Sequence, residues 1–273
     1  MTKRLLPLLF LPIVAVFAVV IVGCSKDEDP IKPPEETKFI IRLKAGQTFI
    51  YDRWKLKMDN TKNDTSKSIY TTTFVGSTGS SLSGYTDYFR RNTVDSKTGT
   101  DETFIRVEPT NGDVMVHGFQ YRIFEELIKQ LNATIPGGIG NPTIAGKKWD
   151  IIGSYTGTPG TTTWNITQAT GELLSFNVTG LGAITLTVWI TGKYAAKDEV
   201  MTVGTKSIKM RKSTITTAID ILGTKQNILV HFWFSDDPNG QIKLMQESAV
   251  LSLGGFFNLS VPGEVQELSA VPL

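Results

Sequence analysis

Short runs in which apolar and polar residues alternate fill the chain from Lys38 onward, and this period of two limits the fold more than any other feature. Successive side chains of a β-strand point to opposite faces, so the alternation predicts strands that bury one face. Turn sequences such as Asn111-Gly112 and Pro262-Gly263 separate many of the runs. The sequence therefore predicts a mainly β domain.

The predicted strands are numerous and closely spaced, which favours a curved antiparallel sheet, either closed as a barrel or left open as a half-barrel. The chain has 273 residues, 40% of them hydrophobic, and we place a single β-rich domain with its own core at residues 38–273. The predicted strands are Gln47–Met58, Ser68–Val75, Tyr85–Arg91, Thr103–Glu108, Asp113–His117, Trp149–Tyr155, Thr161–Thr167, Glu172–Val178, Ile184–Ala195, Glu199–Thr202, Ser207–Leu222, Asn227–Ser235, Gln241–Leu251 and Val265–Val271.

One segment, Tyr121–Asn132, follows a helical period instead. Its apolar side chains fall on one face of a helix, with charged residues elsewhere; they are Ile123, Phe124, Leu127, Ile128 and Leu131. A single amphipathic helix beside a curved sheet is expected to plug or cap it, and a face turned to a membrane or a partner is the alternative. The loop that follows, residues 133–148, is long enough to act as a lid.

The N-terminus has the pattern of a secretion signal. Lys3 and Arg4 precede an uncharged apolar run, Leu5–Val22, that ends at Gly23-Cys24. A run of this length is also compatible with a transmembrane helix. Two prolines early in the run and the lack of a basic cluster after it argue against that alternative.

The last residues of the run, Ile21-Val22-Gly23-Cys24, resemble the lipobox of bacterial lipoproteins. The resemblance implies that the Cys24 thiol is lipidated, that residues 1–23 are removed, and that the new N-terminus is acylated. Several acyl chains give a stable membrane anchor, because each buried CH₂ contributes about 0.8 kcal/mol. Residues 24–37 are rich in proline and charge, so we expect them to form a flexible tether.

The charged residues after the cysteine carry a second, shorter resemblance. Lys26, Asp27 and Glu28 resemble the export signal of Bacteroidetes lipoproteins, which implies a position on the outer face of the outer membrane. A solvated charged tether explains the same residues equally well. The expected location is therefore the outer membrane, by a lipid anchor, on the periplasmic side or at the cell surface.

Charge and cysteine content exclude some partners and bonds. Without Lys3 and Arg4, 26 basic residues face 26 acidic ones, so the mature protein is neutral. A neutral chain with no basic stripe is not expected to bind nucleic acid. Because Cys24 is the only cysteine, no disulfide forms within the domain.

No catalytic or metal-binding pattern emerges from the sequence. His117 and His231 are far apart and lack neighbouring ligands at metal-binding spacing, so we interpret them as partly exposed strand residues. Asp236–Gly240 groups oxygen ligands, but a hairpin turn explains it better than calcium. We predict no catalytic residue, no metal and no cofactor, and that the protein is not an enzyme.

Aromatic residues are the remaining candidates for ligand contacts. Trp149, Trp164, Trp189 and Trp233 all lie in predicted strands. Aromatic side chains on a sheet stack on sugars or line an apolar cavity, and ordinary core packing explains them as well.

The pattern of many strands plus one helix is similar to the lipoprotein-localisation carriers, which are open half-barrels with a helical lid around an apolar cavity. The likeness is architectural and transfers no functional residue. It suggests a binding lipoprotein that holds an apolar or amphipathic ligand. A surface-exposed structural or glycan-binding module is the alternative.

Overall fold

The alternation of apolar and polar residues forms strands in most of the segments where the sequence predicts them. In strand β9, Glu172–Val178, the side chains of Leu174, Phe176 and Val178 are buried while those between them face outward. The hydrophobic effect selects this register, because a slip by one residue would turn every buried side chain to solvent. The expected mainly β fold is confirmed.

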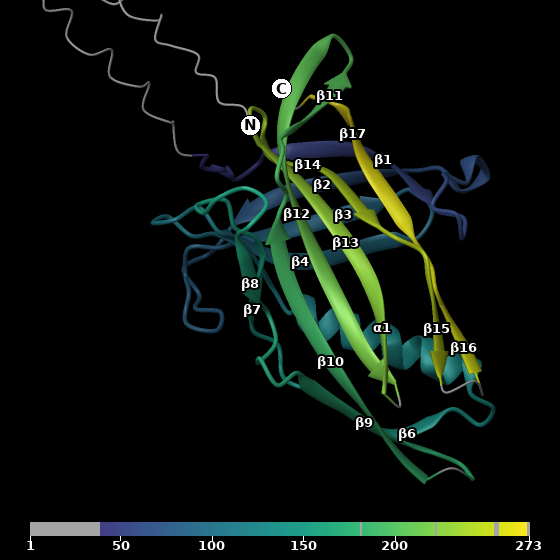
Figure 1. Cartoon of the computed structure of the whole chain (residues 1–273). Helices are drawn as coiled ribbons and strands as arrows, with labels where there is room; N and C mark the ends of the chain where they lie inside the picture. Colours follow the sequence, from purple (N-terminus) through teal and green to yellow (C-terminus); the bar gives the residue numbers. More distant parts are fainter. Residues whose placement is uncertain (1–38, 181, 222, 254–256, 272–273) are drawn as a thin grey trace, which may run out of the picture. The chain divides into compact units, whose positions relative to one another are not determined.

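The computed structural model describes residues 39–180, 182–221, 223–253 and 257–271 (Figure 1). The predicted signal peptide, the tether, the lipidation site Cys24 and the export residues Lys26, Asp27 and Glu28 lie outside the described residues. These assignments therefore stay predictions. No helix within the described ranges is both long and apolar enough to cross a membrane.

The structure has one α-helix, one short 3-10 helix and many strands within its described residues. The helix α1 spans Phe119–Thr134 and the 3-10 helix η1 spans Asp64–Ser66. The strands are β1 Thr48–Lys55, β2 Ser68–Gly76, β3 Phe89–Asp95, β4 Gly99–Val107, β5 Val114–His117, β6 Ile139–Thr143, β7 Trp149–Gly153, β8 Thr163–Asn165, β9 Glu172–Val178, β10 Gly182–Tyr194, β11 Glu199–Val203, β12 Lys206–Ile221, β13 Thr224–Asp236, β14 Asn239–Gln246, β15 Ala249–Leu253, β16 Phe257–Val261 and β17 Glu264–Ala270.

Most strands belong to one large antiparallel sheet. Its order is β6-β9-β10-β12-β13-β14-β17-β1-β2-β3-β4-β5-β7, with β11 beside β12 and β8 beside β10. Among the described strands, the two ends of this path, β6 and β7, do not pair with each other, and β15 and β16 form a separate hairpin. The sheet is therefore open and curved, as expected for a half-barrel.

The curvature brings two halves of the sheet face to face. In Figure 1 the strands β1 to β4 run across the long strands β10, β12 and β13. The inner faces of both halves contribute large buried side chains, including Phe49 and Phe74 from the first and Ile215, Phe232 and Phe234 from the second. A core between two layers of one sheet is the arrangement that this many half-buried strands require.

Side chains fasten the last strand of the path, β7, to the other half of the sheet. The hydroxyl of Ser213 in β12 donates to the carbonyl oxygen of Ile152 at 2.6 Å. The indole of Trp164 in β8 donates to the carbonyl oxygen of Ile151 at 2.7 Å. These bonds connect the backbone of β7 to side chains of β8 and β12.

Helix α1 covers the inner face of the sheet, as the amphipathic pattern predicted. Its buried residues include Phe124, Leu127 and Leu131. Leu127 faces Ile228 and Val230 of β13 across a small pocket that all three line. The helix therefore buries its apolar stripe against the curved sheet and occupies the position expected of a cap.

Several boundaries differ from the sequence-based expectation. The strand expected at residues 85–91 lies at 89–95, because Tyr85 instead pairs with Leu82 in a tight turn. The strand expected at 241–251 splits into β14 and β15, because Ser248 bonds to the loop around Asn60. The expected loop at 133–148 contains β6, whose exposed, polar residues give no alternation.

Candidate ligand-binding cavity

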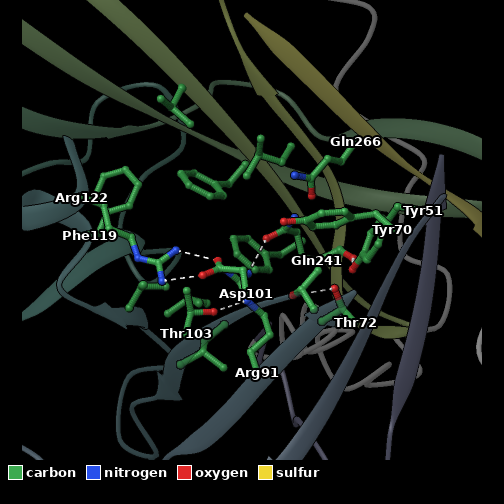
Figure 2. A pocket seen from close by; sticks show the side chains of 18 of the residues that line it. Tyr51, Tyr70, Thr72, Arg91, Asp101, Thr103, Phe119, Arg122, Gln241 and Gln266 are labelled. Carbon is green, nitrogen blue, oxygen red and sulfur yellow. Dashed lines mark hydrogen bonds and ion pairs between the residues drawn. The ribbon is translucent and has the colours of Figure 1, made fainter. Parts of the chain in front are cut away.

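A cavity of about 250 Å³ lies between the two halves of the sheet, beside α1 (Figure 2). Strands β1 to β5 supply one wall and β13, β14 and β17 supply the other. Half of its lining residues are apolar; these residues are Ile41, Leu43, Phe74, Ile105, Val107, Val114, Val116, Phe119, Ile123, Val230, Phe232, Phe234 and Leu244. Apolar walls with convergent polar groups are the usual form of a small-molecule site.

Strand register orders the polar side chains within the cavity wall. Ile105 of β4 pairs with Val116 of β5 at the apolar end. Thr103, two residues before Ile105 in β4, pairs with Arg91 of β3. The next inward-facing pair along β3 and β4 joins Thr93 to Asp101. Because inward side chains repeat every second residue, the wall changes from apolar to polar along the strand direction.

Arg91 is a positively charged side chain in this wall of the cavity. Its Nε donates to the hydroxyl oxygen of Thr103 at 2.7 Å, and its Nη1 reaches the side-chain oxygen of Gln241 at 3.5 Å. Among the described residues, no carboxylate lies within ion-pairing distance of its guanidinium. Desolvation lowers the pKa of Arg91, yet an arginine remains charged at neutral pH. Arg91 therefore has no direct ion-pair partner, and Asp101 acts on it only at longer range.

Two of the three carboxylates that line the cavity form close ion pairs with arginines, and the third, Glu126, lies 3.7 Å from the exposed ammonium of Lys129. Asp101 accepts two hydrogen bonds from Arg122, at 2.8 and 3.2 Å, at the exposed rim of the cavity (Figure 2). Desolvation acts to raise the pKa of Asp101, but the Arg122 bonds outweigh it and the pKa is lowered. Glu264 pairs with Arg53 at 2.6 Å. Neither Asp101 nor Glu264 forms a direct ion pair with Arg91.

Two tyrosines provide neutral hydroxyls near the arginine. Burial raises the pKa of Tyr51, whose hydroxyl donates to the backbone oxygen of Gln241 at 2.8 Å. Burial, and then Glu264, raises the pKa of Tyr70, so its phenol stays protonated. The Tyr70 hydroxyl makes no hydrogen bond with any described residue. It remains available to a ligand.

The four tryptophans predicted to contact a ligand lie elsewhere, and the fold does not bring them together. None of them is among the residues that line this cavity. The indoles of Trp149 and Trp164 donate to backbone oxygens, at 3.0 and 2.7 Å, and that of Trp233 donates to Glu199 at 2.8 Å. Trp189 lies with its ring centre 4.3 Å from a lysine ammonium. Ligand contact by these tryptophans stays a prediction.

The two histidines occupy separate places. His231 is buried, not partly exposed as expected, and bonds to Thr214 and Glu247 at 2.9 and 2.8 Å. Burial lowers its pKa despite Glu247. His231 alternates with the cavity-lining residues of β13, so this hydroxyl–imidazole–carboxylate chain lies on the outer face and binds neighbouring strands together. His117 bonds to Ser83 at 2.9 Å, and burial lowers its pKa.

Metal-binding geometry does not occur within the part of the chain that the structure describes, where no three potential ligands gather. Asp236–Gly240 forms the turn between β13 and β14, as its turn sequence predicted. The residues that sequence analysis missed are Arg91, Tyr70 and Gln241. The only signal for Arg91 was its position two residues after Phe89 in an alternating run.

The chain has only distant similarity to known proteins. No protein-family model and no curated protein matches it. Two solved structures are similar, each with a TM-score of 0.42 and each covering 86% of this chain and 99% of the other. One is a "putative lipoprotein" from Parabacteroides distasonis, at 9% identity, and the other a "putative exported protein with YmcC-like fold" from Bacteroides fragilis, at 10% identity. At this distance the likeness carries no argument about function.

Proposed function

We propose that this protein is a lipid-anchored binding protein of the cell envelope that holds a small amphipathic molecule in its half-barrel and catalyses no reaction. The observation that carries the proposal is the cavity of about 250 Å³, apolar at one end and polar at the other. Such a wall suits a ligand that has an apolar body and one polar group.

The volume limits the size of the ligand. A water molecule occupies about 30 Å³ in the liquid, so a cavity of 250 Å³ has room for about eight non-hydrogen atoms. The rim at Arg122 and Asp101 is exposed, so part of a longer ligand can extend into solvent. We therefore propose a ligand with a short or medium-length apolar chain.

The N-terminal sequence supports the envelope location. The lipobox residues around Cys24 provide an anchor, and the proline-rich residues after it provide a tether of the kind that separates a domain from a membrane. The side of the membrane on which the domain lies follows from the role of Lys26, Asp27 and Glu28, which we propose to be an export signal.

Binding of uncharged alcohols tests the function. The mature lipoprotein in phospholipid nanodiscs is dialysed against 1-alcohols of increasing chain length, with empty nanodiscs as the blank. Each added CH₂ should raise the affinity about fourfold, because its burial contributes about 0.8 kcal/mol, until the cavity is full. Ile123→Trp, which places a larger side chain in the cavity wall, should move this limit to shorter alcohols.

Lys129→Trp is the matched control, because Lys129 lies on the same helix with its side chain 76% exposed. It should bind every alcohol as the wild type does. Alcohol binding that does not exceed the blank, or that responds equally to both substitutions, would show that the cavity is not a binding site.

A further inference from the structure

We infer that the cavity selects an anionic ligand, a monocarboxylate with an apolar tail, and that Arg91 binds its carboxylate group. The inference rests on the proposed function and adds the chemical class of the ligand. Three properties of Arg91 and its surroundings carry it: an unpaired charge, a fixed orientation, and neighbouring donors that the fold leaves free.

The first property is the missing counter-charge. Ion pairs satisfy the other cations along this wall: Arg53 bonds to Asp95 and Glu264, and Arg122 bonds to Asp101. No described carboxylate pairs with Arg91. Partial withdrawal of a charge from water without a direct partner destabilises the folded protein. A bound anion would reduce that penalty, which makes this part of the cavity receptive to negative charge.

The second property is orientation. The bond from Nε to Thr103 at 2.7 Å fixes one edge of the guanidinium, and Figure 2 shows Arg91 beneath the cavity beside Thr103 and Gln241. The two Nη groups have only the long contact of 3.5 Å to Gln241. Paired N–H groups of a guanidinium match the two oxygens of a carboxylate, so this arrangement presents a prepared bidentate site.

The third property is the supply of further donors. The Tyr70 hydroxyl has no bond to a described residue, and the raised pKa of this phenol keeps its proton in place. Tyr70 lies two residues before Thr72 on β2, and the hydroxyl of Thr72 shares a bond of 3.3 Å with that of Thr93 in the paired strand β3. These groups are neutral and Arg122 is paired with Asp101, so Arg91 is the one lining arginine without a direct ion pair among the described residues. A singly charged carboxylate fits better than a doubly charged phosphate monoester.

The apolar end of the wall defines the rest of the ligand. Ile105, Val116 and Phe232 lie on the same cavity as Arg91, and Phe74 is its direct cross-strand neighbour in β2. A ligand whose carboxylate bonds to Arg91 would therefore place its tail among these side chains. Binding combines an ionic contact with burial of an alkyl chain, which distinguishes an acid from the alcohol or amine of equal length.

Three ligands with the same tail test the inference on the full mature lipoprotein in nanodiscs. Octanoate, 1-octanol and octylamine are measured at neutral pH by equilibrium dialysis, with empty nanodiscs as the blank. The wild type should bind octanoate at least tenfold more tightly than 1-octanol and should bind octylamine most weakly. Arg91→Gln, which keeps a donor for Thr103, should remove the preference for octanoate and leave the affinity for 1-octanol within threefold.

Arg90→Gln is the matched control, because the neighbouring Arg90 points to the opposite face, where its side chain is 47% exposed. It should retain the full preference for octanoate. Thermal unfolding without ligand separates a structural from a binding role: Arg91→Gln should be as stable as the wild type or more stable.

The possible failures are distinct. Equal affinity of the wild type for octanoate and 1-octanol overturns the role of Arg91 while the cavity remains a binding site. A preference for octanoate that persists in Arg91→Gln would also overturn the role of Arg91. Failure of all three ligands to exceed the blank overturns the proposed function together with this inference.

Discussion

At the scale of single residues, the close contact between Gly192 and Trp164 determines which residue can occupy position 192. In the sequence, Gly192 is an interruption of the apolar run that forms β10. In the structure, a Cβ atom added to Gly192 would lie 1.9 Å from the ring of Trp164. The absent side chain lets the indole lie against β10 and donate to β7. The glycine is therefore a packing requirement of the Trp164 ring.

Gly192→Ala should lower the free energy of unfolding by about 1–3 kcal/mol, because a methyl group in this position forces the indole to move. Chemical denaturation followed by tryptophan fluorescence measures the change. Gly76→Ala is the control: in β2 the nearest atom to an added Cβ is 3.5 Å away, an ordinary contact. Equal stability of the two variants would show that Trp164 moves without cost.

At the scale of secondary-structure elements, helix α1 depends on a residue from another strand. Gly118, which precedes the helix, has φ of +73° and provides no capping side chain. The carboxylate of Asp150 in β7 instead accepts the backbone N–H of Gln120 at 2.8 Å. This long-range cap explains why the helix begins at Phe119, before the residue expected from the sequence.

Burial of the capping carboxyl group makes stability depend on pH. Burial raises the pKa of Asp150 to about 6, although the helix N–H groups and Lys148 oppose the change. Between pH 4 and 6 the folded protein therefore binds this proton more tightly than the unfolded chain does. The contribution of Asp150 to the free energy of unfolding falls as pH rises through this window, by at most about 3 kcal/mol.

Asp150→Asn should remove this contribution while its amide oxygen still caps the helix. The difference in unfolding free energy between variant and wild type should then grow in favour of the variant from pH 4 to 6. Denaturant titrations at several pH values measure it. Asp150→Ala, which has no cap, should be less stable than Asp150→Asn throughout. A constant difference between Asp150→Asn and wild type would contradict the raised pKa.

At the scale of the whole domain, one hydrophobic core lies between the two halves of a sheet that does not close into a barrel. The hydroxyl of Ser213 in β12 bonds to β7, and among the described strands no backbone ladder joins β7 to β6. The sheet therefore keeps the edge strands β6 and β7 instead of completing a barrel. The cavity lies where the curved halves leave the core incompletely filled.

The predicted lipid anchor belongs to the same scale, because an anchor at Cys24 would hold the whole domain at a membrane. Cys24→Ala should abolish lipidation and leave an unprocessed precursor, since the thiol is the predicted acceptor of the lipid. Intact mass and partitioning into detergent measure the two effects. A normally processed, membrane-bound Cys24→Ala protein would exclude the lipobox assignment. Replacing Lys26, Asp27 and Glu28 with alanine serves as the comparison, because it should leave lipidation unchanged.

The sequence by itself determined the strand content and the single helix. Their signals are local: alternation in segments such as Glu172–Val178, and the spacing of Phe124, Leu127 and Leu131, reflect which face is buried and require no knowledge of the neighbours. Edge segments such as β6 escaped prediction because a strand exposed to solvent needs no apolar face. The start of α1 escaped because its cap comes from β7.

The candidate site was decided only by the tertiary structure. Alternation places Arg91 on the face of β3 that carries Phe89 and Thr93, but it cannot show whether a carboxylate from a distant strand neutralises it. Asp101 is committed to Arg122, and Gln241 reaches Arg91 from 150 residues away. The volume of the cavity likewise depends on how two halves of a curved sheet pack. The pairing state of Arg91 and the volume of the cavity both depend on contacts between segments far apart in the chain, which no local sequence pattern encodes.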